Sequence, residues 1–369
     1  MYFYQTHNVT QKANTKKESE VVMKRKKFLM ILVSALSFAA LFINTVGPTP
    51  IATVNQKRRP QTLLIGGQTF GVKFYTQGVM VVDMSAFETE TGMCNPAKTA
   101  GLRIGDVILS INSQIVSTNN DISELVQSSN GKPLSIEYSR SGKVSILSVT
   151  PLYSTVQKAY KLGLWVRDST AGVGTVTYID PHNRRFGALG HGISDVDTGQ
   201  LMPLSDGDVL QAYIGAVVPG QKGKPGQLKG AFVEDARYGS LDINSNQGVF
   251  GTITGNALLS NEEFPVATTD QIHTGEATIR STVDGFSTKE YRITIEKIDI
   301  KGNDTKNYVI RITDEELLAT TGGIVQGMSG SPILQDGRII GALTHVLIGD
   351  PTTGYGIYLG HMLDADDLS

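Results

Sequence analysis

Cysteine is nearly absent from this chain: Cys94 is the single one among 369 residues. One cysteine excludes an intramolecular disulfide and any zinc site built from several thiolates. The H-E-x-x-H motif is also missing, so metal-dependent hydrolysis has no support, and we expect neither a metal nor a cofactor. Nor is there an excess of charge of one sign. With 33 Lys and Arg against 35 Asp and Glu, the net charge of −2 argues against a nucleic-acid-binding protein.

The sequence is otherwise typical of a folded, glycine-rich protein. Hydrophobic residues make up 40% of it and charged residues 18%, which separates it from disordered chains. Its length fits about two or three domains. Forty glycines against 13 prolines indicate many turns and short strands. We therefore expect a mainly β protein.

The near-neutral total hides an uneven distribution of charge along the chain. Residues 1–60 contain ten basic and two acidic side chains, a net charge of +8, so the remainder carries −10. A Lys-Arg-Lys-Lys cluster at 24–27 directly precedes 19 uncharged residues at 28–46. A membrane helix needs about 20 apolar residues, and a basic flank stays on the cytoplasmic side. The pattern predicts a cytoplasmic basic tail at 1–27, a transmembrane anchor or signal segment at 28–46, and export of the rest.

Whether the segment at 28–46 is retained or cleaved depends on its flanks. Small residues around Val46 suit a cleavage site, but Pro48 disfavours cleavage, and the preceding tail is long for a signal peptide. A retained anchor is therefore favoured over a cleaved signal, and the charged flanks disfavour a buried core helix. Residues 47–61 contain three prolines and are expected to form an exposed linker that proteases can reach.

Residues 62–151 have the pattern of a small α+β module. The string AGLRIGDVILSIN indicates a short helix ending at Gly101, a turn through Asp106 and a strand at 107–111. Asp121 is expected to cap an amphipathic helix, and two alternating strands follow it. The string resembles bacterial PDZ domains of the kind attached to exported proteases.

A PDZ domain implies a groove that takes a peptide tail or an extended segment by adding a strand to its sheet. The glycine-rich stretch GGQTFG at 66–71 is the expected carboxylate-binding loop, because glycines let backbone N–H groups approach an anion. We assign peptide contacts to Gly67, Phe70 and Gly71, with an ordinary glycine turn as the alternative. Asp106 is interpreted as a residue that fixes the turn.

Residues 160–369 form a second region, dense in glycine and short β-like runs, for which a sandwich or barrel is expected. Its string GMSGSP places Ser329 on a tight turn between glycines. Such a turn can project the hydroxyl while the N–H groups of Gly327 and Ser329 stay free to bind an oxyanion. The hairpin that follows is the arrangement of chymotrypsin-like proteases. We expect Thr344, His345 and Tyr355 to line the substrate pocket.

A serine nucleophile needs a base, and His191 is the best candidate. It stands between two glycines, whose lack of side chains makes a core-packing role improbable. His345 is the rival, interpreted instead as part of the substrate pocket.

The residue that would orient the base is less clear from the sequence. Asp195 and Asp197 are near His191, but aspartates in such loops are usually solvated or capping groups. Asp314 precedes Ser329 by 15 residues, but the Glu-Glu-Leu-Leu after it is typical of a helix N-cap. The residues alone leave these alternatives open.

Three strings, GALGHGISDVDTG, ITDEELLATTGGIVQGMSGSPILQDGRIIGALTHV and IGDPTTGYGIY, closely resemble the stage IV sporulation protein B peptidases of spore-forming Firmicutes. The resemblance extends over the whole exported part. It implies a single membrane segment, a PDZ domain and a serine endopeptidase of chymotrypsin-like double β-barrel fold. It also implies a triad of His191, Asp314 and Ser329. That order agrees with chymotrypsin-like enzymes, although Asp314 is unusually close to Ser329.

The resemblance further implies a sporulation-specific role. The protein would be exported across the forespore membrane and cleave the exposed part of a membrane regulator that restrains an intramembrane metalloprotease. Processing of a late mother-cell sigma factor would follow. Self-cleavage would fall in the linker at 47–61. Two alternatives are a non-catalytic, membrane-tethered PDZ scaffold and a general exported quality-control protease, in which the protease normally precedes the PDZ domain.

Overall fold

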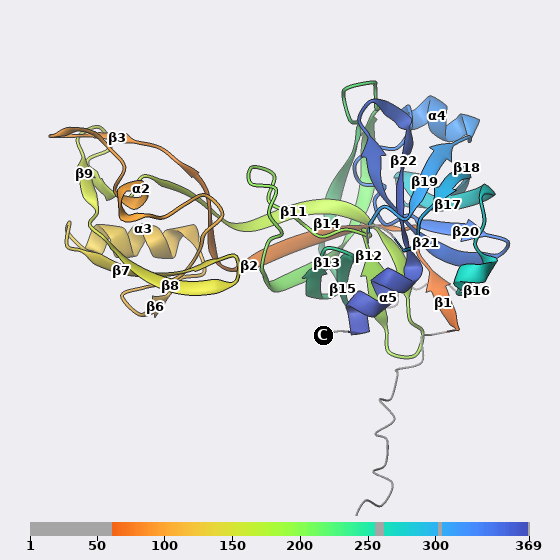
Figure 1. Cartoon of the computed structure of the whole chain (residues 1–369), viewed down its shortest axis with the longest axis horizontal. Helices are drawn as coiled ribbons and strands as arrows, with labels where there is room; N and C mark the ends of the chain where they lie inside the picture. Colours follow the sequence, from red (N-terminus) through yellow and green to blue (C-terminus); the bar gives the residue numbers. More distant parts are fainter. Residues whose placement is uncertain (1–60, 255–261, 302–304, 368–369) are drawn as a thin grey trace, which may run out of the picture. The chain divides into compact units, whose positions relative to one another are not determined.

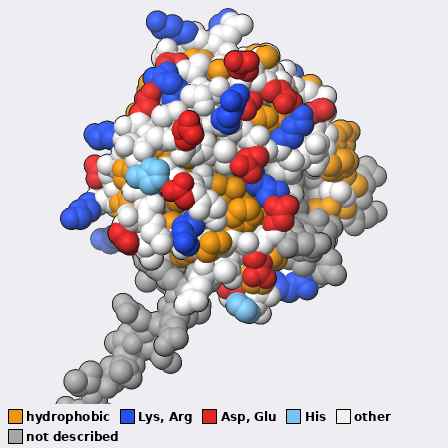
Figure 2. Space-filling model, turned by 90° about the vertical axis from the view of Figure 1, so that its right-hand side faces the viewer, with side chains coloured by type: hydrophobic (Ala, Val, Ile, Leu, Met, Phe, Trp, Pro, Cys, Tyr) orange, Lys and Arg blue, Asp and Glu red, His pale blue; other side chains and the backbone are white. Residues whose placement is uncertain are grey.

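The computed structural model describes residues 61–254, 262–301 and 305–367 (Figure 1). The predicted basic tail, the membrane segment and nearly all of the linker therefore lie outside the described residues. Within the described part, none of the helices combines the length and apolar character needed to cross a membrane. The face seen in Figure 2 intermixes basic and acidic side chains.

The first ring of the peptidase part is built from six antiparallel strands. The pairings run from β2 to β11, β12, β15, β14, β13 and back to β2, so that the ring closes on itself. Phe70, Phe186 and Val209 are fully buried in its core. The strands are β2 (Thr69–Met84), β11 (Leu164–Ile179), β12 (Arg185–Ala188), β13 (Leu204–Val218), β14 (Gln227–Ser245) and β15 (Gly248–Ile253), with β1 (Thr62–Ile65) and β16 (Glu263–Pro265) added beside β11.

The second ring is a closed barrel of six strands in the order β17-β18-β19-β22-β21-β20. Inward residues alternate along these strands, as in β19, where Tyr308, Ile310 and Ile312 are buried. The two rings together give the double barrel expected from the sequence. The strands are β17 (Gly275–Asp284), β18 (Ser287–Ile298), β19 (Tyr308–Ile312), β20 (Pro332–Gln335), β21 (Arg338–Leu347) and β22 (Asp350–Tyr358), with the short helix η1 (Thr269–Gln271) before them and helices α4 (Glu315–Thr321) and α5 (Leu359–Asp367) after β19 and β22.

The PDZ part has a core of its own, which includes Ile108, Ile122 and Ile136. Its elements, besides the second half of β2 and the start of β11, are β3 (Phe87–Thr89), β4 (Gly92–Cys94), α2 (Pro96–Ala100), β5 (Val107–Ile111), β6 (Gln114–Ile115), α3 (Asn119–Ser128), β7 (Leu134–Arg140), β8 (Lys143–Val149), β9 (Leu152–Ser154) and β10 (Ala159–Lys161).

Local chemistry explains the ends of the PDZ helices. Gly101 ends α2 in the left-handed conformation, as the sequence predicts. The N-cap of α3 is Thr118 rather than Asp121, because Asp121 occupies the third helical position and its carboxylate accepts the backbone N–H of Thr118 at 2.8 Å. The structural role of Asp106 is confirmed: it is buried, and Arg140 donates to it at 2.7 Å.

The structure moves the boundaries of the PDZ part away from 62–151. Residues 62–78 belong to the first ring, whereas Leu162, Leu164 and Val166 pack into the PDZ core. The physical reason is that β2 and β11 each run through both parts and pair with each other from Leu164 and Met84 to Thr175 and Thr69 (Figure 1). A peptidase region starting at 160 therefore lacks one strand of its own first ring.

Candidate active site

The turn that carries Ser329 is fixed by glycine geometry. Gly327 and Gly330 have φ angles of 100° and 94°, in the region that favours glycine. A Cβ atom on Gly330 would lie 2.0 Å from the carbonyl oxygen of Thr175. The close approach of the two backbones allows two hydrogen bonds. The backbone N–H of Thr175 donates to the carbonyl of Ser329 at 3.1 Å, and the Thr175 hydroxyl donates to the carbonyl of Gly327 at 2.9 Å. Thr177 likewise donates to Gly330 at 2.8 Å. Strand β11 of the first ring thus holds the turn of the second.

The backbone N–H groups of this turn fall into two sets. Those of Met328, Gly330 and Ser331 donate to backbone carbonyls. Those of Gly327 and Ser329, which alternate with them, have no backbone acceptor among the described residues. Two N–H groups left free beside a serine hydroxyl are what an oxyanion hole requires. The geometry is therefore compatible with the donors expected from the sequence.

The hydroxyl of Ser329 is half-buried and donates to the backbone carbonyl of Thr344 on β21 at 2.6 Å. The hydroxyl of Ser329 is therefore held by the second ring in this structure. A rotation about its χ1 angle would direct the hydroxyl elsewhere without moving the turn.

His191 follows β12 after two residues in the left-handed conformation, Leu189 at φ 67° and Gly190 at φ 68°. Its Nδ1 lies 2.9 Å from the carbonyl oxygen of Gly192. An Nδ1–H that donates to this carbonyl leaves Nε2 free to accept a proton. Burial lowers the pKa of His191, and the Gly192 carbonyl opposes this only in part. The imidazole is therefore neutral near pH 7, as a general base must be.

A cavity of about 630 Å³ opens beside His191, and His345 lies on its wall. The two imidazole rings have their centroids 5.0 Å apart and are tilted by 39°. Desolvation, helped by the charge of Lys306, lowers the pKa of His345 to about 4, so it stays neutral as well. Asn246 and Thr305 also line this cavity.

Thr344, His345 and Tyr355 are brought together beside Ser329. His345 pairs with Tyr355 across β21 and β22, and the side chain of Thr344 donates to the carbonyl of Tyr355 at 3.1 Å. The Thr344 side chain is buried, so its carbonyl is the group that faces the site. Strand β20 pairs with β21 as far as Ala342, so among the described residues no strand pairs with 344–347 on that edge. An extended peptide could add there.

Asp314 is not brought to His191. One of its carboxylate oxygens accepts the N–H of Leu317 at 3.0 Å and the other that of Arg292 at 3.3 Å, so it caps α4. Although burial opposes them, these bonds lower the pKa of Asp314. Val309 of β19 pairs with Tyr355 of β22 in the barrel. Asp314 lies five residues after Val309 in the chain, and five residues of extended chain span roughly 16 Å.

The other two aspartates considered in the sequence are also committed elsewhere. Asp195 is buried and accepts the N–H of Thr198 at 2.8 Å, and both Asp195 and Asp197 pair with Arg167. The acceptor at Nδ1 of His191 in this structure is instead the backbone carbonyl of Gly192. A backbone carbonyl leaves no signal in the sequence.

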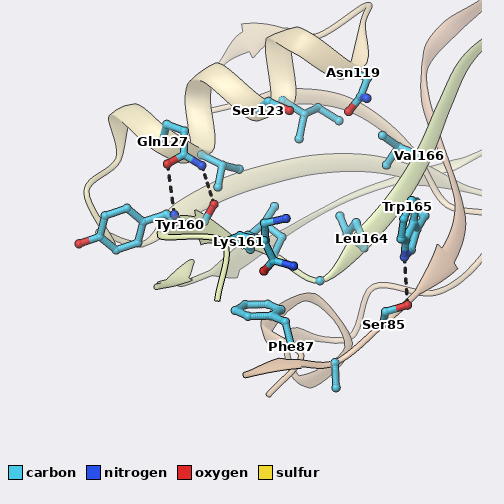
Figure 3. A pocket seen from close by; sticks show the side chains of 16 residues that line it. Ser85, Phe87, Asn119, Ser123, Gln127, Tyr160, Lys161, Leu164, Trp165 and Val166 are labelled. Carbon is cyan, nitrogen blue, oxygen red and sulfur yellow. Dashed lines mark hydrogen bonds between the residues drawn. The ribbon is translucent and has the colours of Figure 1, made fainter. Parts of the chain in front are cut away.

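A second candidate site is the groove of the PDZ part, a cavity of about 390 Å³ between α3 and the start of β11 (Figure 3). Ile122 and Val126 of α3 and Leu164 of β11 give it an apolar wall. Its end is held by Gln127, whose side chain bonds the backbone N–H and carbonyl of Tyr160 at 3.1 and 2.7 Å.

The residues predicted from the sequence to bind the peptide do not line this groove. Phe70 is fully buried in the first ring, where its ring contacts Phe186. Gly71 lies against the ring of Phe232, and the carbonyl of Gly67 accepts the hydroxyl of Thr282. The assignment is corrected because residues 69–71 belong to a strand of the peptidase. The signal that could have located the groove is the apolar-Gly-apolar triplet at 162–164, where β11 begins.

Comparison with known proteins agrees with these two parts. Residues 95–140 match the PDZ domain family, and residues 158–363 match the family described as SpoIVB peptidase S55. A protein of Lactococcus lactis named as a zinc metalloprotease, LL2128, is 34% identical over 102 residues, 27% of this chain and 23% of its own length. A protein of Enterococcus faecalis named as a protease, eep, is 34% identical over 96 residues, 26% of this chain and 22% of its own length. The chain thus spans less than a quarter of either relative.

Solved structures show more distant likeness. The active form of the Rv3671c protease of M. tuberculosis has a TM-score of 0.31 at 17% identity, over 53% of this chain and 73% of its own. The PDZ domain of the SdrC-like protein of Listeria monocytogenes has a TM-score of 0.20 at 18% identity, over 24% of this chain and 87% of its own. The family match, in contrast, extends over more than half of the sequence. The chain belongs to the SpoIVB peptidase S55 family and contains a PDZ domain.

Proposed function

We propose that Ser329 is the nucleophile of this peptidase and His191 its general base. The observation that carries the proposal is the pair of free N–H groups at Gly327 and Ser329, set in a turn whose other N–H groups are all used. A turn that merely connected two strands would have no need to leave these donors free. Each such donor typically contributes about 10²- to 10³-fold to the rate of acyl transfer.

The first step follows from the bond between Ser329 and Thr344. A substrate strand that adds to residues 344–347 brings a backbone N–H to the Thr344 carbonyl and takes over that acceptor. Ser329 then turns toward Nε2 of His191, which removes its proton as the oxygen attacks the scissile carbonyl. The oxyanion is bound by the two free N–H groups.

The remaining steps return the proton and release the products. The imidazolium of His191, whose Nδ1–H is held by the Gly192 carbonyl, gives its Nε2 proton to the leaving amine. A water molecule then loses its proton to Nε2, attacks the acyl-enzyme and frees Ser329. In this scheme Asp314 orients the site indirectly, because α4 leads into the turn, whereas the family resemblance implies a direct role in the triad.

We propose that the biological substrate is the exposed part of a membrane regulator and that the protein also cleaves itself. In this proposal the chain is anchored in the forespore membrane by residues 28–46, with its PDZ and peptidase parts exported. Cleavage triggers intramembrane processing of a late mother-cell sigma factor. Support comes from the three sequence strings around His191, Ser329 and Tyr355, and from a PDZ groove able to hold a peptide.

The proposal is tested by comparing the cut sites made by the full-length protein and by its Ser329→Ala variant. Co-expression with candidate membrane regulators, followed by mass spectrometry of new chain ends, should show cuts in the regulator and in residues 47–61 with the first protein alone. Ser331→Ala is the matched control, since Ser331 is fully buried in the same turn. Equal cleavage by Ser329→Ala would exclude Ser329 as nucleophile. A protein that binds the regulator without any cut would instead be the tethered scaffold.

A further inference from the structure

A small apolar cavity lies on the first-ring side of the nucleophile turn, and the catalytic steps above do not use it. Its volume is about 100 Å³, and its lining contains no charged side chain. The walls come from three places in the chain: β2, the middle of β11 and the segment that carries His191. The lining residues used below are Val72, Ala171, Gly172, Val173, Leu189 and Ile193.

The chain segments that line the cavity also contact or carry both proposed catalytic groups. Thr175, the second residue after Val173, donates its N–H to the carbonyl of Ser329 at 3.1 Å, and its own carbonyl accepts the N–H of Leu189 at 3.3 Å. Leu189 and Ile193 stand two residues before and two residues after His191. The segments that hold Ser329 and carry His191 therefore also supply walls of this cavity.

Different residues surround the proposed catalytic pair, Ser329 and His191, on its two sides. The edge at 344–347 of β21 and the cavity shared by the two histidines lie on one side, and neither contributes a residue to the apolar cavity. The apolar cavity is formed by the first ring alone. In the proposed scheme the residues before the scissile bond add to the 344–347 edge, which leaves the first ring to meet those after it.

The middle of β11 also offers a free edge there. On one edge Gly172 pairs with Val72 of β2. On the other edge β12 begins to pair only at Val176, with Ala188, so residues 170–174 have no second strand partner in the described structure. Ala171 and Gly172 are exposed. Free backbone groups beside an apolar hollow can bind an extended peptide and one of its side chains together.

We propose that this cavity binds an aliphatic side chain of the substrate at the first or second position after the scissile bond. The subsite rests on the proposed roles of Ser329 and His191. A hollow of this size suits a Val, Leu or Ile side chain and excludes an aromatic ring, since engineered cavities that admit benzene have volumes of about 150 Å³. Burial of such a side chain should favour it over alanine by about tenfold or more in kcat/KM.

Gly172 provides the test, because it lines the cavity and a side chain can be added there. Its φ angle is not in the left-handed region, and a Cβ on it would meet nothing within 4 Å. Gly172→Leu fills the space from within. Gly215→Leu is the matched control: Gly215 is also an exposed strand glycine, and its Cβ would meet the Tyr213 ring at an ordinary 3.6 Å. Ile193→Ala enlarges the cavity instead.

The full-length protein and its variants are given a peptide library randomised on both sides of the cut, and products are sequenced by mass spectrometry. We expect Val, Leu and Ile to be enriched after the scissile bond by the unchanged protein and by Gly215→Leu. Gly172→Leu should lose this enrichment and keep its selection before the bond, and Ile193→Ala should shift the enrichment toward Phe.

Two results would overturn the inference, and they differ in what they leave standing. Cleavage that needs Ser329 but shows no aliphatic selection after the bond, or a selection that neither variant changes, removes the subsite alone. Cleavage that persists in Ser329→Ala removes the proposed catalytic roles and the subsite with them. If Gly172→Leu does not fold, as judged by its thermal transition, the inference is tested by whether Ile193→Ala shifts the enrichment toward Phe.

Discussion

Ser329 donates its hydroxyl to the backbone carbonyl of Thr344, 2.6 Å away, and not to the imidazole of His191. The acceptor belongs to the strand edge where a substrate would add. In the proposed mechanism this bond keeps the Ser329 hydroxyl directed away from His191 until a peptide competes for the same carbonyl. It also links substrate alignment to activation of the hydroxyl.

This arrangement makes one backbone N–H of the substrate decisive. A peptidyl phosphonate that labels Ser329 should lose about tenfold in its second-order rate when the residue that bonds to Thr344 is N-methylated, because the hydrogen bond that frees the serine is lost. Labelling is followed by intact-protein mass spectrometry, with Ser329→Ala as the blank. N-methylation of the next residue along should have a smaller effect. Equal losses at both positions would show that the Thr344 carbonyl has no special role.

The acid limb of the pH profile reports His191. Burial lowers the pKa of this side chain below its ordinary 6.5, and a base acts only when neutral. The acid limb of kcat/KM should therefore have its midpoint below pH 6.5. Thermal unfolding at each pH separates titration from denaturation. A limb centred above pH 6.5 would mean that a carboxylate raises the pKa of His191, as in a triad with aspartate.

Asp314 can be assigned by two substitutions with different chemistry. Asn caps a helix about as well as Asp, whereas Ala costs about 1 kcal/mol. Because Asp314 caps α4, we expect Asp314→Ala to lower the unfolding temperature and impair cleavage by displacing the following turn. Asp314→Asn should keep the unfolding temperature of the unchanged protein, and its cleavage rate should stay within a few-fold of that protein's rate. An Asp314→Asn protein of normal stability that is as inactive as Ser329→Ala would instead place the carboxylate in the triad.

The features recognised from sequence are those that local chemistry determines. The turn around Ser329 requires glycines within three residues of one another. The next hairpin has an Asp-Gly pair at its turn, and His191 stands between two glycines. Each is visible in a short window, and the structure has the turn and the hairpin where they are expected.

What the sequence could not provide depends on pairing between distant strands. Asp314 is near Ser329 in sequence, but the register of β19 against β22 carries it away from His345 and hence from His191. The sequence misplaces the PDZ boundary because β2 and β11 each run through both parts as one strand, which only their long-range pairing reveals. Deleting 62–151 would therefore remove β2 and open the first ring.

Because of this, the PDZ groove is better tested by a side chain than by a deletion. Ser123 is exposed on α3 and lines the groove (Figure 3), whereas Ser128 is exposed on the same helix and does not. The groove floor is apolar, so a peptide with an aliphatic end is the expected occupant.

Ser123→Trp should reduce the affinity for such a peptide by tenfold or more, since the indole occupies the space between α3 and β11. Fluorescence anisotropy of a labelled peptide ending in an aliphatic residue measures this directly. Ser128→Trp, which adds the same ring outside the groove, should bind as the unchanged protein does. Cleavage of short peptides should be equal in both, because neither residue belongs to the two rings that hold Ser329 and His191. Loss of short-peptide cleavage in Ser123→Trp alone would mean that filling the groove changes the activity of Ser329. Strand β11 could transmit such a change, because it runs without a break from Leu164 in the groove to Thr175, which bonds to Ser329.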